Sequence, residues 1–343
     1  MTPDASSSPL PPKRADAESR WFVRLLITFL LGFGLPVVAC YGLIVASAVG
    51  LQILFLGANS TPSLSTGGAG SGPAVAVIPV QGVITSGEGS PFTAVTDVAF
   101  SKTVISNIKK ANDDQDIKAI VLTVNSPGGG VVASDDIYHA LEGVDKPVIV
   151  VIGDLGASGA YYISMASDWI LANPNSLVGS IGVISEFPNA EGLLEKVGVD
   201  FVVVTSGPRK DFGSPYREMT DGERAYWQVI IDETYDSFVQ IVAEGRGLTA
   251  EEVKPLADGG VYSGRQALEL KLIDQVGYED DAIKKAAELG GISGEPRIVE
   301  YDTPPDFFSL LSQSVAGRSL VPSLADLMNT LGHPTLSARW VGP

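Results

Sequence analysis

Short β-branched runs alternate with helical stretches from residue 75 onwards, and this alternation constrains the fold more than any other feature. The predicted strands are Val75–Val80, Ile117–Asn125, Pro147–Ile152 and Phe201–Thr205, and the predicted helices are Ala94–Asp113, Ser134–Leu141 and Ala190–Val197. Strands that alternate with helices are typical of βαβ units, in which a mostly parallel sheet forms the core. The sequence therefore predicts an α/β protein.

A longer helix is predicted after residue 220. Thr220 and Glu223 have the spacing of a capping box, in which each side chain accepts a hydrogen bond from the backbone N–H of the other residue. Apolar residues follow at helical spacing from Trp227 to Val242, so we expect the helix to end near Gly245. We interpret the apolar stripe as core or subunit packing.

Two glycine-rich turns follow predicted strands and could carry chemistry. The first, Asn125-Ser126-Pro127-Gly128-Gly129-Gly130, allows backbone N–H groups to point at a ligand without interference from a Cβ atom. No Gly-Lys-Ser/Thr follows, so the segment is not the phosphate-binding loop of nucleotide hydrolases. By itself it is equally well explained as an ordinary turn.

The second turn, Gly156-Ala157-Ser158-Gly159-Ala160, lies between the strand Pro147–Ile152 and an apolar helix that begins near Tyr161. A serine in such a turn is expected to expose its Oγ close to the positive N-terminus of the helix, as in a nucleophile elbow. The spacing differs from Gly-x-Ser-x-Gly, and a serine that only caps the helix fits the pattern too.

A serine nucleophile needs a base, and neither histidine of the chain is a good candidate. The two histidines are His139, in an ordinary helical pattern, and His333, in an irregular tail. A lysine can act instead when burial lowers its pKa towards neutrality. Most lysines lie in charged segments with a helical pattern, whereas Lys210 lies in a turn-rich loop just past Phe201–Thr205. Ligand sites of open α/β sheets concentrate in such loops, so Lys210 is the candidate base.

Five motifs together resemble the signal peptide peptidase A family. They are Asn-Ser-Pro-Gly-Gly (125–129), Gly-Ala-Ser-Gly-Ala-Tyr-Tyr-Ile-Ser (156–164), Val-Gly-Ser-Ile-Gly-Val (178–183), Lys-Asp-x-Gly-Ser-Pro-x-Arg-Glu-Met-Thr (210–220) and Ala-Asp-Gly-Gly-Val-Tyr-Ser-Gly-Arg-Gln-Ala (257–267). The likeness covers about residues 75–315, with the motifs in the same order. It implies a Clp protease/crotonase-like βαβ superhelix that assembles into a homo-oligomeric ring.

The resemblance also implies a catalytic serine–lysine pair. It makes Ser158 the nucleophile, Lys210 the general base and Ser180 the hydroxyl that orients the lysine amine. We expect Lys210 to be buried among apolar neighbours. The oxyanion hole would consist of the backbone N–H groups of Gly129 and Gly159, with Gly128 open as the alternative to Gly129. No cofactor and no metal ion is implied.

The function implied is that of a membrane-anchored serine endopeptidase that degrades remnant signal peptides or other apolar peptides near the membrane. Within the protease class, the alternatives are a SohB-like peptidase and an NfeD-type membrane protease of related fold. From another class, a crotonase-like acyl-CoA enzyme uses similar glycine-rich oxyanion loops, but it needs carboxylates placed over a thioester. A catalytically inactive scaffold is the third possibility, and the intact serine and lysine argue against it.

A run without charged residues, Leu25–Gly57, is long enough to cross a bilayer once. Four basic residues precede it, Lys13, Arg14, Arg20 and Arg24, and none follows before Lys102. The positive-inside rule therefore predicts a cytoplasmic N-terminus and a periplasmic catalytic domain on a bacterial inner membrane. A cleaved signal peptide usually has a shorter apolar core. Val37–Cys40 resembles a lipobox, but the apolar run continues past it.

The predicted domain plan has five parts. They are a disordered cytoplasmic tail at 1–20, a transmembrane helix at 21–57, a Gly/Ser/Thr/Pro-rich linker at 58–74, the protease domain at 75–315, and a C-terminal tail at 316–343. The net charge of −17 argues against nucleic acid as a partner. A single cysteine, Cys40, excludes an internal disulfide and a cysteine-based zinc site.

Overall fold

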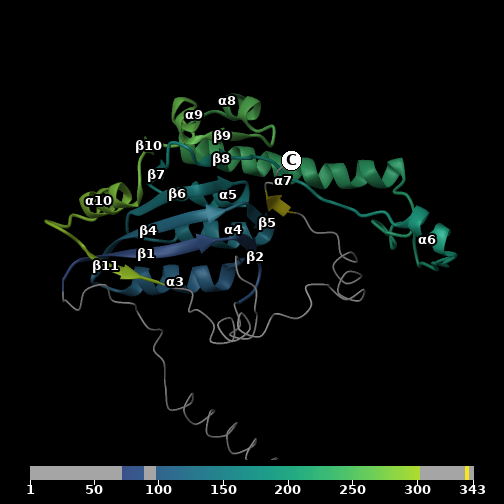
Figure 1. Cartoon of the computed structure of the whole chain (residues 1–343), viewed down its shortest axis with the longest axis horizontal. Coiled ribbons are helices and arrows are strands. Elements are labelled where there is room, and N and C mark those ends of the chain that lie inside the picture. The colour runs from purple at the N-terminus through teal and green to yellow at the C-terminus, as the bar shows by residue number, and fades with distance from the viewer. Residues whose placement is uncertain (1–71, 89–97, 302–336, 340–343) are drawn as a thin grey trace, which may run out of the picture. The chain divides into compact units, whose positions relative to one another are not determined.

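The computed structural model describes residues 72–88, 98–301 and 337–339 (Figure 1). Its larger sheet has eight strands, with the order β10-β7-β6-β4-β1-β11, β8 beside β6, and β9 beside β8. All pairings in this sheet are parallel except β8–β9. Its strands are β1 (Ala74–Gln81), β4 (Ile117–Ser126), β6 (Val148–Ala157), β7 (Trp169–Ala172), β8 (Leu177–Gly179), β9 (Val261–Ser263), β10 (Gln275–Val276) and β11 (Arg297–Glu300).

A smaller sheet of four strands has the order β12-β5-β2-β3. Its strands are β2 (Val83–Thr85), β3 (Val98–Phe100), β5 (Gly128–Gly130) and β12 (Ser337–Arg339). The pairing of β2 with β3 and with β5 is parallel, whereas β12 runs antiparallel to β5. This sheet brings together segments that lie more than 200 residues apart in the chain.

The helices are α3 (Ser101–Asp113), α4 (Val131–Glu142), α5 (Gly159–Ser164), α6 (Glu191–Val197), α7 (Asp221–Arg246), α8 (Ala250–Val253), α9 (Gly264–Glu269) and α10 (Glu279–Leu289), with a short 3-10 turn, η2 (Lys254–Leu256). Most lie in the chain between strands of the larger sheet. The predicted α/β class and mostly parallel sheet are confirmed.

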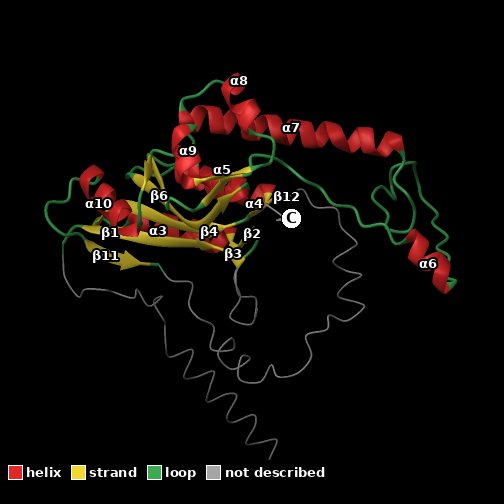
Figure 2. Cartoon of the chain, turned by 45° about the horizontal axis from the view of Figure 1, so that its top comes forward, coloured by secondary structure: helices red, strands yellow, loops and turns green. Residues whose placement is uncertain are grey.

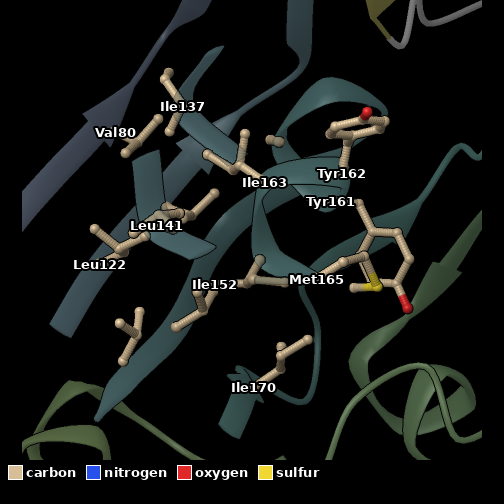
Figure 3. Close-up of a cluster of buried hydrophobic side chains, with 14 of the residues drawn as sticks. Val80, Leu122, Ile137, Leu141, Ile152, Tyr161, Tyr162, Ile163, Met165 and Ile170 are labelled. Carbon is tan, nitrogen blue, oxygen red and sulfur yellow. The ribbon is translucent and has the colours of Figure 1, made fainter. Parts of the chain in front are cut away.

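Alternate residues of each central strand face opposite sides of the larger sheet, as the strand period of two requires. Even-numbered residues of β1 and β4, such as Ile78 and Leu122, belong to a core formed with α3, α4 and α5, part of which Figure 3 shows. Odd-numbered residues, such as Val75 and Val121, pack against Ala282 and Ala286 of α10. Full burial of a side chain such as Leu122 stabilises the fold by about 1.5–3 kcal/mol.

The predicted long helix is α7, and its capping box is formed as expected. Glu223 N–H donates to Thr220 Oγ1 at 3.3 Å, and Thr220 N–H donates to Glu223 Oε2 at 2.9 Å. Arg217 also donates to both oxygens of Glu223. These hydrogen bonds lower the pKa of the Glu223 carboxyl to about 2, so it remains ionised at any physiological pH.

Residues 185–220, here called the arm, pack on the N-terminal half of α7 (Figure 2). An aromatic cluster joins the arm to this helix: the ring centroids of Phe187 and Phe212 in the arm and of Trp227 in α7 lie 5.0–5.6 Å apart. The C-terminal half of α7 is different, because Phe238 and Val242 are buried in the main core.

The predicted strand Phe201–Thr205 is wrong. The segment belongs to no strand, and Val202 and Val204 are 91% and 92% exposed. A β-branched run forms a strand only when a neighbouring strand accepts its hydrogen bonds, and no described segment of the chain lies beside this one as a strand.

Several predictions on the domain plan lie outside the described residues. They are the tail at 1–20, the transmembrane helix at 21–57, most of the linker at 58–74, and the boundary at 315–316. Among the residues that are described, no helix has both the length and the apolar character needed to cross a membrane.

Candidate active site

Ser158 stands between the end of β6 and the start of α5, as the turn pattern predicted. Its φ and ψ angles are 55° and −119°, a conformation that L-residues rarely adopt and that costs about 1–3 kcal/mol. Two hydrogen bonds hold this turn: Ser158 N–H donates to Gly179 O at 2.7 Å, and Tyr162 N–H donates to Ser158 O at 2.8 Å. Strained serines at strand-to-helix turns are typical of nucleophile elbows.

The expected exposure of the Ser158 hydroxyl is wrong, because the residue is only 1% exposed. Strands β5 and β12 both contact α5, the helix that Ser158 caps. The C-terminal segment of the chain thus contributes to the surroundings of the residue, and the local turn pattern carries no information about this long-range contact.

Ser180 lies next to Ser158 because their strands are paired. Ala157 at the end of β6 is opposite Gly179 at the end of β8, and parallel strands lie about 4.8 Å apart. Ser180 is 5% exposed and has a φ of 51°. Its N–H donates to Gly260 O at 2.7 Å. The structure therefore brings together two of the three residues predicted for catalysis.

The glycine-rich segment is a strand, β5, where the sequence suggested a turn. A Cβ atom on Gly129 would lie 1.9 Å from the carbonyl oxygen of Ile84, so the parallel pairing of these two residues requires glycine. Gly128 has a φ of 89°, and its N–H donates to Ser126 Oγ at 3.0 Å. The N–H group of Gly128 therefore already has an acceptor, whereas this hydrogen bond does not involve the N–H group of Gly129.

Gly159 is the first residue of α5. The first N–H groups of a helix have no partner within the helix. None of the described residues accepts a hydrogen bond from the Gly159 N–H. This donor next to Ser158 is available to an acceptor from outside the fold.

Strand β12 occupies the free edge of β5. Ser337, Ala338 and Arg339 are opposite Gly130, Gly129 and Gly128, in antiparallel register. The edge that presents the glycine-rich segment therefore accepts an extended peptide backbone beside α5. The sequence contained no local signal for this pairing, because the C-terminal tail has no strand pattern of its own.

Lys210 lies on the arm and is exposed, so the expectation of a buried lysine is wrong for the single chain. The adjacent Arg209 stacks on Tyr226 at 4.4 Å, near the start of α7. Further along α7, Phe238 packs on Tyr162 of α5. Phe238 comes twelve residues after Tyr226. At 1.5 Å per residue, this corresponds to about 18 Å along the helix. One chain by itself does not bring Lys210 to Ser158.

His139 and His333 are the remaining candidate bases. His139 is 87% exposed at its side chain and pairs with Glu142 at 3.4 Å, whereas His333 lies outside the described residues. The described part of the chain contains no cluster of three His, Cys, Asp or Glu side chains arranged to hold a metal ion.

Comparison with known proteins assigns the family. The model of peptidase family S49 matches residues 140–293, and that of ClpP-like SDH-type serine proteinases matches residues 73–198. A relative from Synechocystis that carries a protease name is 40% identical over 268 residues, 78% of this chain and 90% of the relative. A protein from Enterococcus faecium that carries the name signal peptide peptidase SppA is 34% identical over 273 residues, 78% of each chain. The chain belongs to the signal peptide peptidase A family.

Membership of this family makes the chain a serine protease. Protease 4 from Salmonella typhi is 34% identical over 275 residues, which are 79% of this chain but only 43% of that longer protein. The region matched by the S49 model contains Ser158, Ser180 and Lys210, and both models contain Ser158 and Ser180. The resemblance that the five motifs suggested is confirmed.

Proposed function

We propose that the chain is an endopeptidase whose nucleophile is Ser158 and whose substrate binds as an extended strand along β5. One observation carries this proposal: residues 337–339 pair antiparallel with Gly128–Gly130, beside the helix that Ser158 caps. A peptide laid on this edge by β-augmentation would pass directly over the nucleophile. An acyl-CoA enzyme has no need of such an edge.

The chemistry proposed is acyl transfer. The neutral amine of Lys210 removes the Ser158 proton, and Oγ attacks the scissile carbonyl carbon. The N–H groups of Gly129 and Gly159 stabilise the oxyanion, with Gly128 as the alternative to Gly129. Protonated Lys210 then protonates the leaving amine, and water hydrolyses the acyl-enzyme. Ser180, next to Ser158, orients the amine.

We place the lysine of one copy beside the serine of the next copy in a homo-oligomeric ring. Two findings support this arrangement. Lys210 is exposed, and its neighbour Arg209 contacts α7 about 18 Å along the helix from the contact between α7 and α5. The arm also presents β-branched residues that have no partner strand among the described residues. Val202 and Val204 would pair with a strand of the neighbouring copy, and an apolar run of this kind is typical of an interface. The ring would complete the βαβ superhelix of the Clp protease/crotonase type.

The proposed substrates are cleaved signal peptides and other apolar segments near the membrane. The name signal peptide peptidase of the relative from Enterococcus faecium supports this choice. An apolar run at 25–57 would tether the protease to the bilayer in which such peptides remain after cleavage.

The proposed location is the periplasmic side of a bacterial inner membrane, with a cytoplasmic N-terminus. The basic residues before the apolar run support this topology. A protease added to right-side-out spheroplasts should degrade the domain after residue 57 and spare an epitope tag at the N-terminus. Protection of the catalytic domain in intact spheroplasts, with degradation after lysis, would show the opposite topology.

A fluorophosphonate probe tests the proposed nucleophile directly. The full chain in detergent micelles should be labelled at Ser158, identified by mass spectrometry of the modified peptide, because only an activated serine attacks the phosphorus atom. A crotonase-like acyl-CoA enzyme and an inactive scaffold should both remain unlabelled. Labelling at another serine, or no labelling, would contradict the assignment.

Removal of residues 337–343 should speed up both labelling and hydrolysis. Strand β12 occupies the edge on which we place the substrate, so its removal eliminates competition for that edge. We expect kcat/KM for a short peptide to rise at least severalfold, measured against the full chain at equal concentration. A fall in kcat/KM with unchanged folding would mean that β12 forms part of the active site and does not compete with the substrate.

A further inference from the structure

Arg217 uses every hydrogen-bond donor of its guanidinium group, although the proposed mechanism gives it no role. Its Nε donates to Asp211 Oδ2 at 2.8 Å, and its Nη2 donates to the carbonyl oxygen of Asp211 at 3.3 Å. Nη1 and Nη2 also donate to the two carboxylate oxygens of Glu223, at 2.9 and 2.6 Å. A fifth hydrogen bond joins Nη1 to Glu218 O at 3.0 Å. A guanidinium group has five N–H donors, so none is left over.

These hydrogen bonds join two different elements. Asp211 directly follows Lys210 in a turn of the arm, whereas Glu223 lies in the first turn of α7 and is 7% exposed. The hydrogen bonds from Arg217 lower the pKa of both carboxyl groups, so both partners are ionised. A guanidinium that binds a carboxylate through two parallel hydrogen bonds fixes orientation as well as distance. Arg217 therefore fixes the residue after Lys210 relative to the start of α7.

The neighbours of Lys210 on both sides are held against the same part of α7. Arg209 stacks on Tyr226 at 4.4 Å, and the ring centroids of Phe212 and Trp227 lie 5.0 Å apart. Lys210 itself is exposed. The chain on either side of the lysine is thus held in place, while the lysine side chain extends into solvent.

We propose that Arg217 is a positioning residue for the catalytic lysine, because it fixes the turn that carries Lys210 to the start of α7. This inference rests on the proposed role of Lys210 as the general base. Apolar packing of Phe212 is largely non-directional, so it holds the turn near α7 without setting its orientation. The hydrogen bonds of Arg217 set that orientation. A displacement of about 1 Å at a catalytic group lowers a rate about 100-fold, so the orientation of the turn matters for proton transfer.

Arg217→Lys tests the inference at constant charge. A lysine ammonium is a point charge and does not reproduce the planar, forked contacts with Asp211 and Glu223. For the full chain in detergent micelles, we expect kcat for a quenched peptide to fall about 10- to 100-fold. KM should change by less than about twofold, because β5, where we place the substrate, contains none of these residues. Unchanged kcat, or a rise in KM alone, would overturn the inference.

A double variant shows whether Arg217 acts through Lys210. If it does, adding Arg217→Lys to Lys210→Arg should lower the residual rate by less than about twofold, since that chain has no base left to position. An independent structural role of Arg217 would lower the residual rate about 10-fold or more, as in the unsubstituted chain. That multiplicative loss would overturn the inference.

Thr220→Ala is the matched control, because it weakens the same helix start without touching Arg217. It removes the hydrogen bond from Glu223 N–H to Thr220 Oγ1 and leaves both hydrogen bonds from Arg217 to Glu223 in place. The variant should melt at a lower temperature, as loss of an N-cap predicts, but keep kcat within about twofold. A loss of kcat as large as that in Arg217→Lys would show that only the stability of α7 matters, and would overturn the inference.

Asp211 supplies a second pair of variants, which does not depend on the folding of Arg217→Lys. Asp211→Asn keeps a side-chain oxygen that can accept from Arg217 Nε, whereas Asp211→Ala removes it. We expect kcat of Asp211→Ala to be at least about fivefold lower than kcat of Asp211→Asn. Equal values of kcat in these two variants would overturn the inference.

Failure of the proposed function gives a different result from failure of this inference. If Lys210 is not the base, Lys210→Arg itself keeps its activity, and the inference fails with the proposed function. If only the inference is wrong, Lys210→Arg loses its activity while Arg217→Lys cleaves the quenched peptide as fast as the unsubstituted chain.

Discussion

Replacement of Ser158 with alanine is expected to lower kcat for peptide hydrolysis by a factor on the order of 10⁶. The substitution removes only the attacking oxygen, and no described side chain depends on this hydroxyl for a hydrogen bond. The folded state should therefore retain its far-ultraviolet circular dichroism and its melting temperature. Cleavage of a quenched peptide, followed by fluorescence, measures the loss.

Ser164→Ala is the matched control for this loss. Its hydroxyl is equally buried but bonds the backbone of α5, so the variant should lose about 0.5–1.5 kcal/mol of stability and keep most of its activity. Turnover in Ser158→Ala that matches the unsubstituted chain would remove the central assignment, whatever the control shows.

Lys210→Arg is expected to lower kcat about 10²- to 10⁴-fold, although it preserves the positive charge. A guanidinium group remains protonated throughout the working pH range, so it cannot remove the Ser158 proton. Initial rates of cleavage of a quenched peptide, measured for both chains at one pH, give the loss.

Two controls accompany the lysine variant. Lys196→Arg changes another lysine of the arm, on α6, and should leave the rate unchanged. His139→Ala should also remain active, since His139 is a surface residue paired with Glu142. Activity of Lys210→Arg close to that of the unsubstituted chain, or loss of activity in a folded His139→Ala, would disprove the serine–lysine mechanism.

The proposed sharing of the pair between copies has its own test. A mixture of Ser158→Ala and Lys210→Arg chains, assembled together, should recover activity because some interfaces combine an intact serine with an intact lysine. Each variant alone should stay inactive. Complete inactivity of a mixture that co-assembles, shown by copurification of two different tags, would require a pair formed within one chain.

Local patterns in the sequence were sufficient to predict the elements that depend on nearest neighbours. The β-branched runs of β1, β4 and β6 alternate between the two faces of the sheet, and the capping box starts α7 at Asp221. The turn around Ser158 was recognisable because small residues between a strand and a helix favour one backbone geometry. Burial on one face and hydrogen bonds within a turn are properties of a short segment.

Only the tertiary structure decided what surrounds the nucleophile. Strand β5 exists because Ile84 and residues 337–339 pair with its glycines, and both β5 and β12 contact the helix that follows Ser158. Phe201–Thr205 has strand composition but no described partner strand, and Lys210 lies on the arm, about 18 Å along α7 from the contact with α5. Pairing between distant segments depends on which partner the fold places at an edge, and composition determines only that a segment could pair.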